Sequence, residues 1–282
     1  MKAEQATDPV AFHGEGPVWC PSWGGLRWVD LLAGDVLTLA EDGSVLRRHV
    51  SQILAVLRPR RGGGAVLGLE RGFALEAPGG ELTRLGALWS GEDLRMNEGG
   101  CDPDGRFYCG SMAYDQREGA GALYRLDPDL SVHRILDRVT ISNGLEWSPD
   151  GTRAYYNDTA TQRISVFDYQ LYDGLTSRRV LVDLSAEEAS PDGLTVDAQG
   201  GVWVALAAAG EVRCYSPEGA LQAVVEVPTR KVTACAFGGP GLRTLFITTS
   251  QEGRAPGTDP LAGALFRAVP GVAGLPVREF AG

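Results

Sequence analysis

The chain has 282 residues, of which 44% are hydrophobic and 22% charged, and it contains 38 glycines and 16 prolines. This composition suits a globular core with many turns and argues against disorder and against long helices. The formal net charge of -10 makes nucleic acid and anionic membranes poor partners, because clustered lysine and arginine bind phosphates. Small neutral ligands and cations fit this charge better.

The first residues, MKAEQATDPVAFHG, lack the apolar core of a signal peptide. No apolar run in the chain approaches the ~18 residues of a transmembrane helix. We therefore expect a cytoplasmic protein without membrane partners. The odd number of cysteines, without a CxxC or Cys/His zinc spacing, indicates reduced core residues. These five residues are Cys20, Cys101, Cys109, Cys214 and Cys235.

A hairpin pattern recurs along the chain and first suggests the architecture. Residues 141–158, ISNGLEWSPDGTRAYYND, alternate apolar and polar positions around a Ser-Pro-Asp-Gly turn, which is typical of a β-hairpin. The same pattern returns at 97–107 and 192–203. In all three copies, an oxygen-bearing side chain lies eight residues before the turn glycine.

Turn glycines at positions 25, 63, 105, 151, 200 and 239 are separated by 38, 42, 46, 49 and 39 residues. Periods of ~40–50 residues with several short strands per unit are typical of β-propellers, whose blades hold four antiparallel strands. We predict an all-β, six-bladed propeller that forms one domain over residues 1–282, with a metal site in its central channel.

The predicted strands follow the chain in six groups. They are 16–19, 26–31, 35–40 and 45–50; 53–57, 65–70, 72–77 and 82–88; 99–101, 106–111, 121–127 and 132–137; 141–147, 153–157, 163–169 and 178–183; 193–196, 202–206, 211–215 and 221–227; and 234–237, 244–249 and 264–269. The missing strand of the sixth unit must come from 276–280 or from the N-terminus, which would close the ring and protect its edges. Two long loops are expected, at 113–120 and 251–263.

The starts of the first strands should converge at one mouth of the channel, because the first strand of every blade lines it. The equivalent positions are Glu15, Leu54 or Ala55, Asn97, Asn143, Asp192 and Lys231 or Thr233.

Two carboxylates and one or two amides in such a ring suit a divalent cation. Glu15 and Asp192 would balance its charge, while Asn97 and Asn143 would offer uncharged oxygens. The absence of cysteine and of clustered histidine favours calcium, magnesium, manganese or ferrous iron over structural zinc, although zinc fits an open catalytic site. The alternative is that each residue only forms a turn before glycine. Four such residues in register favour the site.

Several motifs together resemble one known family, the regucalcin/gluconolactonase family, also called the senescence marker protein family. The motifs are GEGPVW at 14–19, RMNEG at 95–99, DPDGR at 102–106, GSM at 110–112, GALY at 121–124, ISNGL at 141–145, PDG at 191–193, CAFGG at 235–239 and the final FAG. This resemblance implies a six-bladed propeller that binds one divalent metal in its channel and hydrolyses sugar-acid lactones.

Residue roles follow from the resemblance position by position. Glu15, Asn143 and Asp192 match the metal ligands of that family. Asp192 is also our candidate general base, because it can both touch the metal and reach water.

Three further positions match substrate-contacting residues. Arg95 and Asn97 match substrate-contacting positions of the family. Asp115 matches an acidic residue that is a glutamate in animal relatives, and its shorter side chain leaves the sugar open among gluconolactone, xylonolactone, arabinonolactone and galactonolactone. We expect a monomer that acts on such a small-molecule lactone.

Other functions stay open at this stage. A serine hydrolase is disfavoured, because the chain has no Gly-x-Ser-x-Gly motif and only three histidines, of which His13 is expected to be a packing residue. A propeller could instead be a calcium-binding regulator, an interaction scaffold, or a hydrolase of organophosphates or other esters. A polar, acidic channel argues against the scaffold.

Overall fold

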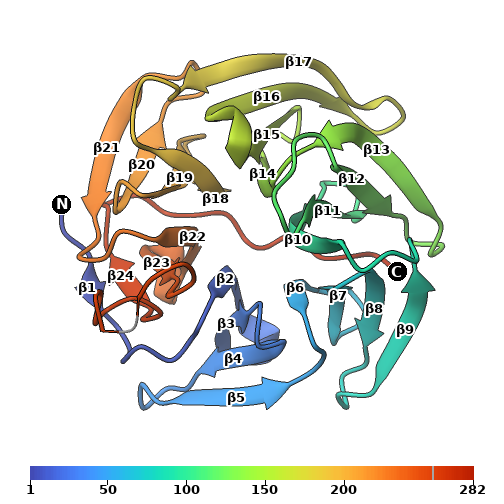
Figure 1. Ribbon diagram of the computed structural model, residues 1–282, viewed down its shortest axis with the longest axis horizontal. Helices are drawn as coiled ribbons and strands as arrows, with labels where there is room; N and C mark the ends of the chain where they lie inside the picture. The colour runs from blue at the N-terminus through green and yellow to red at the C-terminus, as the bar shows by residue number, and fades with distance from the viewer. Residues whose placement is uncertain (256) are drawn as a thin grey trace.

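The protein is a six-bladed β-propeller. A computed structural model describes residues 1–255 and 257–282, and six four-stranded antiparallel sheets are arranged in a ring around a central axis (Figure 1). This confirms the predicted fold class. Residue 256, which falls in the loop predicted at 251–263, lies outside the described residues.

The blades follow one another around the ring, and each is given from its inner strand outward. They are β2 (Gly14–Cys20), β3 (Gly25–Asp30), β4 (Asp35–Leu39), β5 (Val45–His49); β6 (Leu54–Pro59), β7 (Ala65–Leu69), β8 (Gly72–Glu76), β9 (Leu82–Ala87); β10 (Leu94–Cys101), β11 (Phe107–Ala113), β12 (Gly121–Leu126), β13 (Val132–Val139); β14 (Ser142–Trp147), β15 (Arg153–Asp158), β16 (Arg163–Gln170), β17 (Gly174–Asp183); β18 (Ser190–Val196), β19 (Val202–Ala207), β20 (Glu211–Tyr215), β21 (Leu221–Glu226); and β22 (Val232–Gly238), β23 (Thr244–Thr249), β24 (Phe266–Ala268), β1 (Glu4–Gln5).

Helical structure in the described part of the chain is limited to three 3₁₀ turns. These are η1 (Pro21–Trp23), η2 (Thr159–Thr161) and η3 (Pro240–Leu242). None of the described helices has the length and apolar character needed to cross a membrane. All five cysteines are buried free thiols, as predicted.

Burial follows the radial position of each strand. The inner strands β6 and β10 are almost fully buried, whereas the outer strands β5 and β9 expose most of their residues. Six hydrophobic clusters each fill the space between two adjacent blades. In one of them, Tyr108 and Trp147 pack with ring centroids 5.4 Å apart. Each blade therefore buries its apolar faces only against its neighbours.

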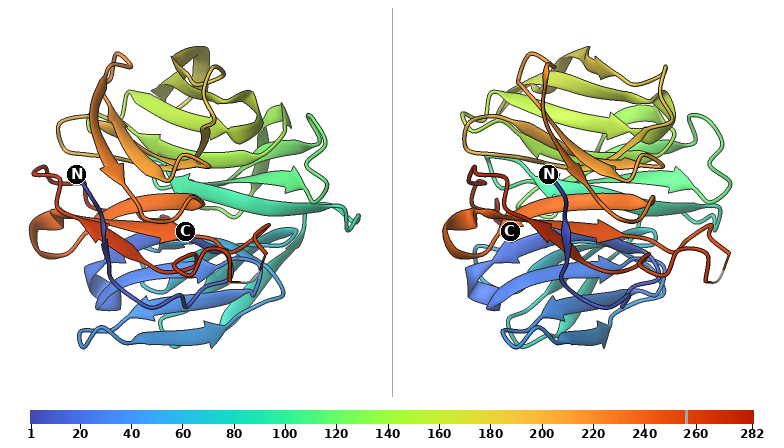
Figure 2. Two further views of the ribbon diagram at one scale, coloured as in Figure 1. Left: turned by 60° about the vertical axis from the view of Figure 1, so that its left-hand side comes forward. Right: turned by 90° about the vertical axis from the view of Figure 1, so that its left-hand side faces the viewer.

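The N-terminus closes the ring, which decides between the two closures left open by the sequence. Strand β1 pairs with β24, with Glu4 opposite Arg267 and Gln5 opposite Phe266. The sixth blade is thus built from both ends of the chain (Figures 1 and 2). Strand β1 therefore supplies the outer strand of the sixth blade, which has four strands like the other five.

The other candidate segment, 276–280, crosses the ring instead of joining a sheet. Arg278 donates hydrogen bonds to the Glu146 carboxylate and to the Ser148 carbonyl, at 2.8 and 3.0 Å. Phe280 is fully buried between the second and third blades, and its backbone bonds to both Pro59 and Arg61. The C-terminal segment therefore ties distant blades together (Figure 1).

Replacing Phe280 with alanine should destabilise the protein. We expect the free energy of unfolding to fall by about 3–5 kcal/mol, the usual cost of truncating a fully buried phenylalanine. Val269→Ala is the control, since Val269 directly follows β24 and is 66% exposed. Urea denaturation measures the free energy of unfolding of both variants. Equal, small losses in the two variants would contradict the role of Phe280 in holding the C-terminal segment against the blades.

Candidate metal centre

The inner strands begin at the same mouth of the channel, and each is interrupted there by a shift in pairing register. The shifts lie between Glu15 and Val18, Leu54 and Val56, Met96 and Gly99, Ser142 and Leu145, Pro191 and Leu194, and Val232 and Ala234. A β-bulge leaves a residue unpaired and re-aims the neighbouring side chains. In the first, third, fourth and fifth blades the bulge carries a polar candidate site residue, whereas in the second blade it carries apolar residues only.

Glycine permits two of these bulges, because the inner strands approach closely there. A Cβ on Gly144 would lie 2.6 Å from the backbone nitrogen of Leu194, and one on Gly193 would lie 2.5 Å from the Ala234 Cβ. Both contacts are far shorter than packed atoms allow. The Asn-Gly and Asp-Gly pairs seen in the sequence thus combine a polar side chain with a close approach of neighbouring blades.

Three carboxylates meet at this point. Glu15, Glu98 and Asp192 are all buried, and one oxygen from each lies within 4.8 Å of the other two. Among the described residues, Asp192 Oδ1 and Glu98 Oε2 have no hydrogen-bond partner. Buried acceptors that lack partners are costly, and convergent hard oxygens are the donors that divalent cations prefer. The donor set therefore fits a divalent cation.

Electrostatics supports the same conclusion. Burial raises the pKa of Glu15 and of Asp192 well above the usual range, and repulsion from neighbouring carboxylates adds to the shift. Burial also raises the pKa of Glu98 to about 7, although Arg58 lowers it in part. The three groups cannot all ionise cheaply without a positive partner. A cation would take the place of the protons and return the carboxylates to their charged form.

Two asparagines extend the cluster on one side. Asn97 Nδ2 donates to Asn143 Oδ1 at 3.0 Å, and Asn143 Nδ2 donates to Thr159 Oγ1 at 2.7 Å. These bonds fix the direction of the Asn143 amide while its oxygen keeps a free lone pair. Arg95 Nη1 donates to Asn97 Oδ1 at 2.5 Å. The predicted residues Arg95, Asn97 and Asn143 thus form one continuous buried chain.

Asp115 lies apart from this buried chain. It is exposed in the loop between β11 and β12, and its carboxylate accepts hydrogen bonds from Arg117, which also contacts Asp93. Within the described structure, its hydrogen bonds and ion pairs do not reach the carboxylate cluster. Its role toward a substrate therefore stays a prediction.

Sequence reasoning missed Glu98 as a member of the site. In a regular strand, Glu98 would point away from the face that Asn97 occupies. The register shift between Met96 and Gly99 breaks that alternation. Strand β10 also begins at Leu94, five residues before the strand predicted to start at 99. The Asn-Glu-Gly-Gly run at 97–100 was the signal available for such a bulge.

A second group of polar residues surrounds Glu15. Lys231 Nζ donates to the Glu252 carboxylate at 2.6 Å, and Glu252 comes from the long loop after β23. His13 is buried beside them, which lowers the pKa of its imidazole to about 3, chiefly through desolvation. His13 Nε2 lies 3.7 Å from Glu15 Oε1. The prediction that His13 only packs therefore leaves out its polar surroundings.

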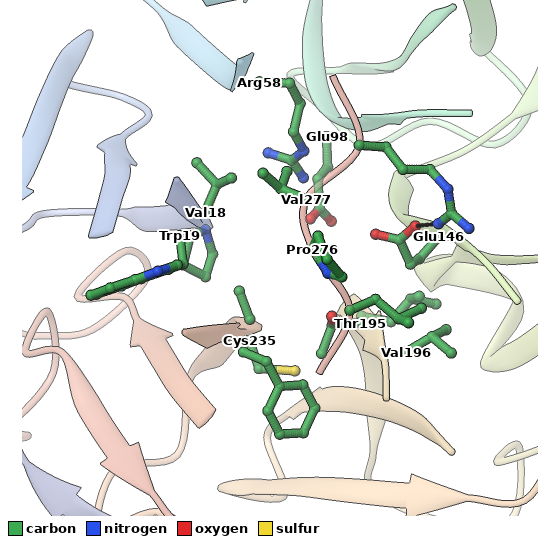
Figure 3. A pocket seen from close by; sticks show the side chains of 16 residues that line it. Val18, Trp19, Arg58, Glu98, Glu146, Thr195, Val196, Cys235, Pro276 and Val277 are labelled. Atoms are coloured by element: carbon green, nitrogen blue, oxygen red, sulfur yellow. Dashed lines mark hydrogen bonds and ion pairs between the residues drawn. The ribbon is translucent and has the colours of Figure 1, made fainter. Parts of the chain in front are cut away.

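Glu98 also lines a cavity of about 50 Å³ (Figure 3). Its lining includes Arg58, Glu146 and the C-terminal segment from Leu275 to Arg278. A water needs roughly 10–15 Å³ of such volume, so the cavity has space for a few waters. Glu98 therefore belongs both to the carboxylate cluster and to the lining of this cavity.

Glu98 should make the stability of the cation-stripped protein depend on pH. The pKa of Glu98 in the folded state, about 7, lies above its ordinary value of 4.5. The folded state therefore binds more protons than the unfolded state, and the free energy of unfolding falls as the pH rises from 4.5 through 7. Urea denaturation of the chelated protein should give a larger free energy of unfolding near pH 6 than near pH 8. In Glu98→Gln, this difference between the two pH values should be smaller. Identical pH dependence in both proteins would contradict this assignment.

Comparison with known proteins places the chain in a family. Residues 13–251 match the family described as SMP-30/Gluconolactonase/LRE-like region. Regucalcin of Danio rerio is 32% identical over 279 residues, covering 95% of this chain and 95% of its own length. A Bacillus subtilis protein with the provisional name sugar lactone lactonase YvrE is 32% identical over 291 residues, covering 100% of this chain and 99% of its own.

A solved structure agrees over the whole ring. A calcium-binding protein named regucalcin from Agrobacterium tumefaciens superposes with a TM-score of 0.93 at 25% identity, covering 99% of this chain and 97% of its own. The shared fold, the family match and the relatives together confirm the resemblance seen in the sequence motifs. The chain therefore belongs to the SMP-30/gluconolactonase/LRE-like family.

Proposed function

We propose that this protein hydrolyses the lactone of a sugar acid to the aldonic acid and uses one divalent cation at the channel mouth. The observation that carries the proposal is the buried set of Glu15, Glu98 and Asp192 in a chain of this family, in which Glu98 and Asp192 each have an oxygen without a hydrogen-bond partner among the described residues. The names of two relatives support it, one as a sugar lactone lactonase and one as calcium-binding.

Glu15, Asn143 and Asp192 would hold the cation, and Glu98 would add a third negative charge beside them. When bound, the cation supplies Lewis-acid chemistry that polarises the lactone carbonyl and balances the charge on its oxygen during attack. Because the donors are all oxygens, they favour calcium, magnesium or manganese over metals that prefer sulfur or nitrogen, while ferrous iron and zinc stay candidates.

Asp192 would act as the general base. Its Oδ1 is buried and free of hydrogen bonds, while the backbone carbonyl of the same residue accepts a bond from Asn157 Nδ2 at 2.6 Å. The backbone is therefore fixed while one carboxylate oxygen is free to accept a proton. Asp192 takes this proton from the attacking water and returns it to the ring oxygen as the ester bond breaks. The product is a hydroxy acid, which ionises in solution.

Substrate orientation would fall to the polar groups beside the cluster. Arg95 is buried and held against Asn97, so its guanidinium is preorganised to donate to sugar hydroxyls. Lys231 and Glu252 add a donor and an acceptor near the same mouth. Such alternating polar groups suit a polyhydroxylated, uncharged ligand. They do not distinguish among gluconolactone, xylonolactone and related sugars.

A second candidate function is calcium binding without turnover. The naming of the Agrobacterium relative as a calcium-binding protein favours this possibility. Proton release from a panel of sugar lactones, measured with and without chelator, separates the two. Hydrolysis that stops on chelation and returns with cation supports the lactonase. Tight calcium binding without hydrolysis of any lactone supports the binding protein.

Two substitutions of Asp192 should separate cation binding from proton transfer. Asp192→Ala should abolish tight divalent-cation binding, because it removes a ligand from a small set. Asp192→Asn keeps an oxygen for the cation but cannot take a proton, so turnover should collapse while some binding survives. Titration calorimetry and the lactone assay measure the two effects, with the surface variant His49→Ala as control. Near-normal turnover of Asp192→Asn at saturating cation would exclude Asp192 as the base.

Asp115 and Asp93 offer a matched test of substrate contact. Both carboxylates bind Arg117 and both are exposed, so either alanine variant removes one surface ion pair. If Asp115 holds sugar hydroxyls, Asp115→Ala should lower lactonase kcat/KM by roughly tenfold, or about 1.4 kcal/mol, with cation affinity unchanged. Asp93→Ala should change little. Equal losses in the two variants would show that only the shared arginine contact matters.

A further inference from the structure

His13 joins two parts of the fold directly beside the candidate metal centre. Its backbone forms an isolated antiparallel bridge with Ser250, so the segment before β2 lies against the segment after β23. The backbone nitrogen of His13 also donates to Asp30 Oδ1 at 2.9 Å. The imidazole is therefore carried by backbone that is fixed on both sides. Its position in the seam between the first and sixth blades does not depend on its own ring contacts.

Ring contacts distinguish the two nitrogens of His13. Nδ1 lies 2.7 Å from Ser250 Oγ and 3.5 Å from Glu252 Oε2, and Nε2 lies 3.7 Å from Glu15 Oε1. The Ser250 hydroxyl oxygen accepts the backbone N–H of Glu252 at 3.0 Å. Its own hydrogen has two possible acceptors, Nδ1 at 2.7 Å and the Phe12 carbonyl at 3.4 Å. The shorter, better contact is the one to Nδ1.

A hydroxyl that donates to Nδ1 fixes the tautomer of the ring. The imidazole hydrogen then lies on Nε2, on the side that faces Glu15. The opposite tautomer would turn the Nε2 lone pair toward the Glu15 carboxylate, which is unfavourable when that carboxylate is charged. The Glu252 carboxylate on the Nδ1 side is already balanced by Lys231, whose Nζ donates to it at 2.6 Å. Glu15 Oε2 already accepts the backbone N–H of Gly16 at 3.1 Å. Glu15 Oε2 thus faces the backbone N–H of Gly16, and Glu15 Oε1 faces the Nε2–H of His13.

We propose that His13 is a positioning residue for the metal centre and that Ser250 sets its tautomer so that Nε2 orients the Glu15 carboxylate. The inference rests on the cation site of the proposed function but not on lactone turnover. At 3.7 Å the contact is electrostatic rather than a full hydrogen bond. Partners of this kind around metal ligands commonly change cation affinity by about 10- to 100-fold when they are removed.

Three substitutions of His13 test which nitrogen matters. Glutamine places its amide nitrogen at the same number of bonds from Cα as Nε2, asparagine reproduces the position of Nδ1, and leucine removes both polar contacts. Calorimetric titration with calcium and, separately, with manganese should show a roughly 10- to 100-fold loss of affinity in His13→Leu and His13→Asn. His13→Gln should stay within a few fold of wild type, which a purely structural packing role would not produce.

Ser250→Ala supplies an independent variant if the histidine substitutions fold poorly. It should weaken cation binding by less than His13→Leu, and it should have no further effect in a His13→Leu background, because the two act through one contact. His49→Gln is the control, since His49 is largely exposed and pairs with Asp35 on the surface. Circular dichroism and thermal melts of the chelated proteins show whether each variant keeps its fold.

Three results would overturn the proposal. They are wild-type affinity in a folded His13→Leu, rescue by asparagine rather than glutamine, or an undiminished effect of Ser250→Ala in the leucine background. A wild type that binds calcium in a His13-dependent manner but hydrolyses no lactone would leave the proposal intact and refute the lactonase. A wild type that binds neither ion would refute both.

Discussion

Three buried carboxylates in one small space are the constraint around which the centre of this propeller is organised. Two like charges about 4 Å apart repel by roughly 4 kcal/mol even at an effective dielectric constant of 20, and removal from water adds to that cost. Glu15, Glu98 and Asp192 can coexist only with added protons or with a cation between them. A fold stable enough to tolerate this arrangement is therefore required before any chemistry can occur at the mouth.

The propeller meets that requirement by separating stability from the site. Apolar burial lies in six seams between blades, away from the channel axis. The ends of the inner strands, where pairing is already broken by bulges, carry the polar groups. A blade can thus lose regular pairing at its inner tip without losing its packing. The second layer of polar contacts, such as Thr159 on Asn143, then sets the direction of each side chain.

The repeat in the sequence predicted the fold, and it placed two of the candidate site residues in register because each has a fixed offset from a turn. Asn143 and Asp192 each lie eight residues before a turn glycine, so their register, and hence their meeting in space, follows from the period alone. Positions that break the period could not be found this way. Glu98 shares a bulge with Asn97, where strict alternation fails.

Glu252 and His13 illustrate a second limit of sequence reasoning. Glu252 lies in an irregular loop, whose path depends on tertiary contacts such as the bond from Lys231. His13 precedes the first inner strand, and its neighbour Ser250 is 237 residues away in the chain. The choice between the two ring closures was open for the same reason, since either terminus could have supplied a fourth strand and only packing decides between them.

Closure of the ring by β1 also constrains the order in which the molecule can assemble during synthesis. The pairing of Glu4 with Arg267 joins residues from the two ends of the chain. The first five blades can form from consecutive segments as they leave the ribosome. The sixth must wait until residues up to Ala268 have emerged, and until then β1 has no partner strand. The two seams beside the sixth blade are therefore the last to form. One of them carries His13, so this side of the metal centre is also completed last.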